Sequence, residues 1–170
     1  MNRGVRLRLA VAITVVLGLH LTALADLRLA GVRPDAPLLV AITAGLVAGA
    51  ERGAIVGFAA GVLADLFLPS PFGLSALVYC LVGFGIGSVQ SGILRSAWWI
   101  PVVTAFTASA AGIVLFAVLG VMVGETEMVG PRLPLIALLV GLMNAALAPA
   151  ATRLLTWAVR AGTPDRNYAI

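Results

Sequence analysis

Long apolar stretches alternate with short polar segments along the whole chain. A transmembrane helix needs about 20 mostly apolar residues, and shorter apolar helices can pack inside a bundle. Charged residues, prolines and glycines gather between the stretches, as expected of turns. The pattern predicts an all-α fold, a polytopic integral membrane bundle of about six transmembrane helices in a single domain over residues 1–170. The expected spans are approximately 9–25, 37–50, 54–66, 74–89, 98–123 and 133–153.

The first apolar stretch, Leu9–Ala25, follows Arg3, Arg6 and Arg8 and therefore also looks like a signal peptide. Three small residues at its end resemble a cleavage site. Because the rest of the chain is itself polytopic, we favour an uncleaved membrane anchor. Both interpretations place the N-terminus on the same side of the membrane.

The second stretch, Leu38–Leu66, is too long for one span. A single helix would measure about 43 Å, whereas the hydrocarbon core is about 30 Å thick. It would also place Glu51 and Arg52 near the middle of the membrane, where charges are costly. Two short helices with a tight turn at Glu51, Arg52 and Gly53 resolve both problems. A re-entrant hairpin is the alternative.

The arginines indicate the orientation, because cytoplasmic loops of membrane proteins are enriched in basic residues. Six spans place both termini on one side, which we expect to be the cytoplasm of a bacterial cell with the chain in its inner membrane. That side carries Arg3, Arg6, Arg8, Arg52, Arg95, Arg153, Arg160 and Arg166, whereas the other carries Arg28, Arg33 and Arg132.

Composition excludes several classes of function. Apolar residues make up 61% of the 170 residues, too many for a soluble enzyme or a disordered protein. The net charge of +4 comes from eleven basic residues that are all arginine. We interpret this charge as a determinant of membrane topology and expect no nucleic-acid partner. The single cysteine, Cys80, lies in an apolar run and is typical of a buried, reduced thiol.

Glycines recur every fourth residue from Gly45 to Gly61. Small residues at this spacing form a flat strip on a helix, where another backbone can approach closely. One interpretation is tight packing within the bundle. The other is a docking face for a second membrane protein.

Asp65 is the most informative charge, because it falls one helical step after the glycine series. It could cap a turn at headgroup level, or pair with Arg28 or Arg33. Alternatively, it belongs to a polar cluster in the outer leaflet with His20 and Arg33. Asn144 is a candidate for hydrogen bonding between helices.

Residues suited to catalysis are scarce. There is one histidine, no HExxH motif and no serine in a GxSxG context. We therefore expect no enzymatic activity, no catalytic residue, no metal site and no cofactor.

The region from Pro34 to about Gly87 resembles the family of the rod shape-determining protein MreD. It reads as PD, then GFxxGxxxD, then PxGxxAxxYxxxG, with Phe84 where the family often has tyrosine. The matching residues are Pro34, Asp35, Gly57, Phe58, Gly61, Asp65, Pro71, Phe72, Gly73, Ala76, Tyr79 and Gly83.

The resemblance implies a non-enzymatic scaffold in the lipid bilayer that supports lateral peptidoglycan synthesis. Its direct partner would be an MreC-like bitopic protein docked on helix faces. Indirect partners would be MreB filaments, a RodA-type polymerase and a class B penicillin-binding protein. The family's fold also resembles the S components of vitamin transporters, so the alternative is a small-molecule or lipid-binding protein. The first span lacks the AxxxA docking motif typical of S components.

Overall fold

The computed structural model describes residues 31–67, 71–90 and 99–160. All helices and strands assigned within these ranges are helices, which confirms the all-α prediction. The elements are α2 (Ala36–Ala48), α3 (Ala50–Asp65), α4 (Leu74–Gln90), α5 (Ile100–Met122), the short 3-10 helix η1 (Thr126–Met128) and α6 (Leu133–Arg160). The expected span 9–25 and its alternative as a signal peptide lie outside the described residues, as does the C-terminal tail.

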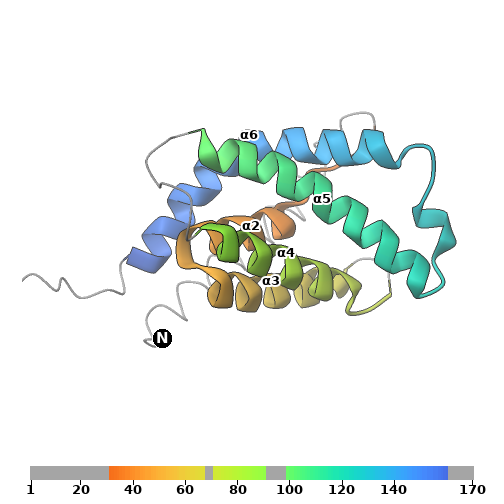
Figure 1. The fold of residues 1–170 in the computed structure, drawn as a ribbon, viewed down its shortest axis with the longest axis horizontal. Coiled ribbons are helices and arrows are strands. Elements are labelled where there is room, and N and C mark those ends of the chain that lie inside the picture. The colour runs from red at the N-terminus through yellow and green to blue at the C-terminus, as the bar shows by residue number, and fades with distance from the viewer. Residues whose placement is uncertain (1–30, 68–70, 91–98, 161–170) are drawn as a thin grey trace, which may run out of the picture.

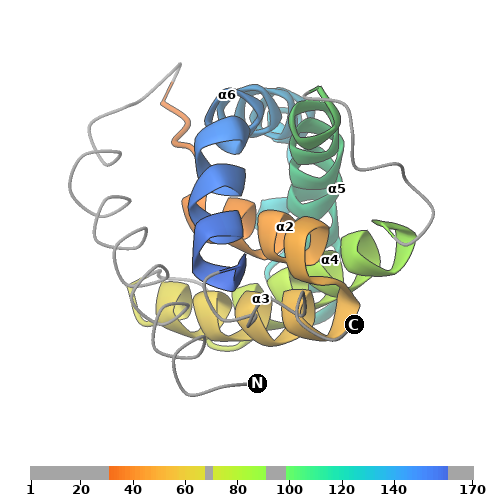
Figure 2. The same ribbon diagram turned by 90° about the vertical axis from the view of Figure 1, so that its left-hand side faces the viewer.

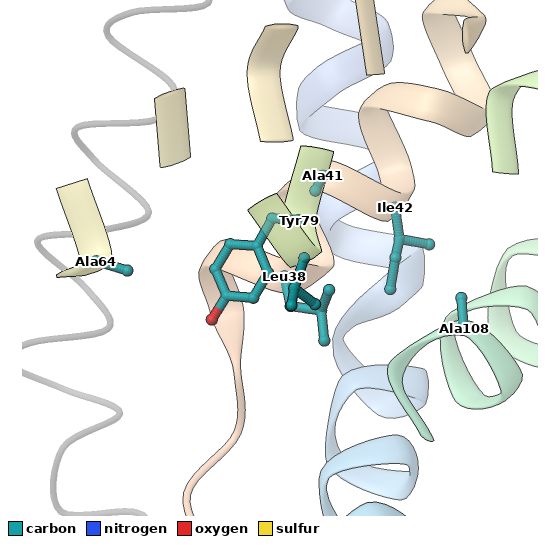
Figure 3. Close-up of a cluster of buried hydrophobic side chains, with 7 residues drawn as sticks. Leu38, Ala41, Ile42, Ala64, Tyr79 and Ala108 are labelled. Atoms are coloured by element: carbon teal, nitrogen blue, oxygen red, sulfur yellow. The ribbon is translucent and has the colours of Figure 1, made fainter. Parts of the chain in front are cut away.

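The helices form two antiparallel pairs around a central helix (Figures 1 and 2). Helices α3 and α4 lie side by side, α5 and α6 form the second pair, and α2 contacts all four. Helix α2 is apolar around its whole circumference, which is the pattern of a helix buried in a core. Its residues Leu38, Ala41 and Ile42 pack against Tyr79 of α4 and Ala108 of α5 (Figure 3).

The turn between α2 and α3 lies at Gly49, so the predicted turn at Glu51, Arg52 and Gly53 is wrong. Gly49 has φ 88°, a backbone conformation that glycine adopts without steric cost. Its N–H still donates to the carbonyl of Gly45, which closes the last turn of α2. Glu51 and Arg52 are exposed in the first turn of α3, so neither charge needs a loop of its own.

Helix α6 bends sharply along its length (Figures 1 and 2). Pro149 lies inside the helix, and proline removes one backbone hydrogen bond and kinks a helix. The hydroxyl of Thr152 donates to the carbonyl of Ala148, a contact that also tends to bend helices. The helix does not end near Arg153, as expected from the sequence, but continues to Arg160.

The structure supports a helical membrane protein but does not confirm six spans. In the described ranges, two helices are long and apolar enough to cross a membrane, Ile100–Met122 and Leu133–Ala158. The apolar helices Ala36–Ala48 and Leu74–Val89 are shorter. Helix α2 is enclosed by the other helices, so its length of about 20 Å does not have to match the bilayer.

Candidate functional site

Asp65 caps the start of α4 from the end of the preceding helix. Its carboxylate accepts hydrogen bonds from the backbone N–H groups of Gly73 at 2.8 Å, Ser75 at 3.2 Å and Ala76 at 3.3 Å. The first N–H groups of a helix have no partner within it and carry partial positive charge. They therefore stabilise a carboxylate that is only 5% exposed.

The chain between the two helices brings these N–H groups to Asp65. Gly73 has φ 96°, and the N–H of Leu74 donates to the carbonyl of Pro71, so the backbone turns directly into α4. The motif residues Asp65, Pro71 and Gly73 thus form one local structure. Of the alternatives that the sequence left open, the structure shows the capped turn.

Asp35 performs a related role at the start of α2. One carboxylate oxygen accepts from the backbone N–H of Leu38 at 3.0 Å, as an N-cap does. The other accepts a hydrogen bond from the hydroxyl of Tyr79 at 2.8 Å, which joins the start of α2 to α4. In Figure 3 the Tyr79 ring lies beside Leu38, with its oxygen directed away from Ile42.

Asn144 extends this connection to the second pair of helices. Its side-chain amide donates to the backbone carbonyl of Asp35 at 3.0 Å and to the hydroxyl of Ser109 at 2.9 Å. Asn144 and Ser109 are both fully buried. Helices α2, α4, α5 and α6 are therefore linked by hydrogen bonds centred on Asp35. The sequence indicated Asn144 as a bonding residue, but no sequence signal identified Ser109 as its partner.

The glycine strip lies between helices of the same chain. A side chain at Gly57 would collide with the backbone of Tyr79, and one at Gly61 with the backbone of Ala76. Gly53 of α3 and Gly83 of α4 face each other in the same way. Helices α3 and α4 thus touch backbone to backbone, and a partner protein could reach this strip only by displacing α4.

The remaining candidate residues differ in where they lie. Pro34 is buried beside Asp35, whereas Phe58 is exposed on the outer face of α3. Arg33 is exposed, and within the described ranges it forms no ion pair with Asp65. His20, Arg28 and the polar cluster proposed with His20 fall outside the described residues.

The described helices form a bundle that is joined by hydrogen bonds between helices. Within the described residues, no group of three histidine, cysteine, aspartate or glutamate side chains could hold a metal ion. The polar side chains Asp35, Asp65 and Asn144 are engaged with backbone groups. Asp35 and Asn144 also bond the hydroxyls of Tyr79 and Ser109, respectively. Their evident contribution is to fix the helices relative to each other.

The chain matches a known protein family. The family model described as rod shape-determining protein MreD matches residues 2–157 of the chain. This range extends well beyond the Pro34–Gly87 region in which the motifs lie. Neither a comparison with curated proteins nor one with solved structures found a match.

Proposed function

This chain belongs to the MreD family of rod shape-determining proteins, and from that premise we propose that it is a non-enzymatic membrane scaffold. Membership suggests a role in rod shape determination. The scaffold would hold an MreC-like bitopic protein in the cytoplasmic membrane of a bacterium. Through that partner it would support lateral peptidoglycan synthesis by MreB filaments, a RodA-type polymerase and a class B penicillin-binding protein.

Exposed helix faces are the surfaces that such a partner could contact. The outer face of α5 carries small and β-branched side chains at helical spacing, among them Val103, Thr107, Ala111, Val114 and Val118. Such side chains lose little rotamer freedom and allow another helix to approach closely. The hydroxyl of Thr107 donates to the carbonyl of Val103 at 2.9 Å, so it is already satisfied in an apolar setting.

The outer face of the α3–α4 pair is different. It presents the large side chains of Ile55, Phe58, Leu77, Leu81 and Phe84. Large apolar side chains are well suited to contact with lipid acyl chains, but they hold a neighbouring helix backbone at a distance. The observation that supports docking on α5 is therefore the row of small and β-branched side chains around Thr107 and Ala111.

Co-purification tests this docking face. The variant Ala111→Leu adds bulk at the centre of the α5 face, and Ala146→Leu adds the same bulk at an exposed position of α6. We expect Ala111→Leu to abolish co-purification of the MreC-like protein and Ala146→Leu to retain it, with both variants still inserted in the membrane. Undiminished co-purification with Ala111→Leu would exclude the α5 face. If the unaltered chain binds no MreC-like protein, the scaffold proposal itself fails.

A further inference from the structure

The turn between α3 and α4 exposes large apolar side chains. Leu66 and Phe67 are each 61% exposed, and Phe72 is 69% exposed. The one charged side chain among the described residues of this turn, Asp65, is buried. We call Leu66, Phe67, Pro71 and Phe72 the hairpin tip. A tip that faced water would leave several large apolar side chains solvated.

Described backbone N–H groups on both sides of the hairpin tip are satisfied from within the protein. Asp65 accepts hydrogen bonds from the N–H groups of Gly73, Ser75 and Ala76, around the start of α4. The N–H of Phe67 donates to the carbonyl of Ala64, and that of Leu74 to the carbonyl of Pro71. Internal satisfaction of this kind is required of backbone in hydrocarbon, where no water replaces a missing partner.

The dimensions of the helices agree with an immersed tip. At about 1.5 Å per residue, α3 and α4 measure about 24 Å and 26 Å, whereas α5 measures about 35 Å and the hydrocarbon core about 30 Å. The hairpin tip and the α5–α6 connection lie at the same end of the bundle, and the connection extends farther (Figure 1). The connection carries exposed Glu125, Glu127 and Arg132, which mark the level of water.

We propose that the hairpin tip is seated in the hydrocarbon of the bilayer and is covered by lipid acyl chains. The α3–α4 pair then reaches only part of the way into that leaflet, while α5 and α6 continue to its surface. Asp65 makes this position possible, because it satisfies the start of α4 without water. This proposal is independent of the docking of a partner on α5.

Tryptophan fluorescence in vesicles tests the depth of the tip. The native Trp98, Trp99 and Trp157 are replaced by phenylalanine in the full chain, and one tryptophan is then introduced as Phe72→Trp. The matched control is Val129→Trp, because Val129 is also exposed and lies in the charged α5–α6 connection. Each purified variant is placed in phosphatidylcholine vesicles with or without bromine atoms on the acyl chains.

We expect Phe72→Trp to emit at shorter wavelength and to be quenched by brominated chains several-fold more strongly than Val129→Trp. Acrylamide, a quencher dissolved in water, should show the opposite order. Equal quenching of both variants by acrylamide would place the tip in water and overturn the proposal. Shielding of Phe72→Trp from both quenchers would show a protein cover and would overturn it as well.

A second measurement avoids the loss of the native tryptophans. In a Cys80→Ala background, a membrane-impermeant maleimide should label Val129→Cys and leave Phe72→Cys unlabelled until the membrane is dissolved with a denaturing detergent. Equal labelling of both in intact vesicles would contradict an immersed tip.

Discussion

The two helix pairs of this protein are held together by different means. Helices α3 and α4 touch through glycines at the backbone, and one buried carboxylate closes their turn. Helices α5 and α6 meet largely through side chains. The ring of Phe106, with the carbonyl oxygen of the same residue nearby, lies against Gly141, and Ser109 is bonded to Asn144. Their connection carries exposed charges.

The short pair and the long pair therefore differ in how well they can adapt to a substitution. Backbone contact leaves no side chain that can adjust, so the α3–α4 pair tolerates little change in volume. Side-chain contact leaves the α5–α6 pair room to adapt. We therefore expect sensitivity to substitution to concentrate in α3 and α4, and the following predictions test that expectation.

The largest effect is expected for Gly57→Ala. The added methyl group would collide with the backbone of Tyr79, so the two helices must separate, at a cost of about 3 kcal/mol or more. The matched control is Gly85→Ala in α4, where nothing lies within 4 Å of the added carbon. That variant should be neutral or stabilised by about 1 kcal/mol. Thermal unfolding in detergent measures both, and similar midpoints would refute the backbone contact.

A smaller loss is expected for Asp65→Asn. The amide retains one acceptor oxygen, but its NH₂ group faces backbone N–H groups and cannot accept from them. Leaving buried donors unsatisfied costs about 1–3 kcal/mol. The exposed Glu127→Gln in the α5–α6 connection loses the same charge without such bonds and should leave the unfolding midpoint unchanged. Equal midpoints for the two variants would show that the cap contributes no stability.

Ser109→Ala should weaken the α5–α6 pair only modestly. It removes the bond to Asn144, and hydrogen bonds between membrane helices average about 0.6 kcal/mol. A double-mutant cycle with Asn144→Leu isolates this contribution. A coupling as large as the loss from Asp65→Asn would remove the distinction between the two pairs.

The smallest effect is expected for Gly141→Ala. Its added carbon would lie 3.0 Å from the ring of Phe106 and 3.1 Å from its carbonyl oxygen, and the ring can move. A steric cost of about 1 kcal/mol is offset by the better helix propensity of alanine, about 1 kcal/mol. The unfolding midpoint should therefore stay near that of the unaltered chain. A loss like that of Gly57→Ala would show that α5 and α6 are as tightly fitted as α3 and α4.

The sequence determined the helices more accurately than their contacts. Apolar runs follow from local composition, so α4 and α5 begin and end within two residues of the predicted spans. The α2–α3 turn was misplaced, because a charged pair is a typical turn signal. The structure instead breaks the helix at Gly49, which alone in that segment supplies the positive φ.

Tertiary structure decided what the motif residues do. Spacing identified the glycine strip and Asp65, since small residues and lone charges stand out in an apolar sequence. It could not identify α4 as the helix that covers the strip, nor Gly73, Ser75 and Ala76 as the donors to Asp65. The residues on a helix face indicate only that another element packs closely against it. Which element packs there depends on how the whole chain folds back on itself, and that information is not local.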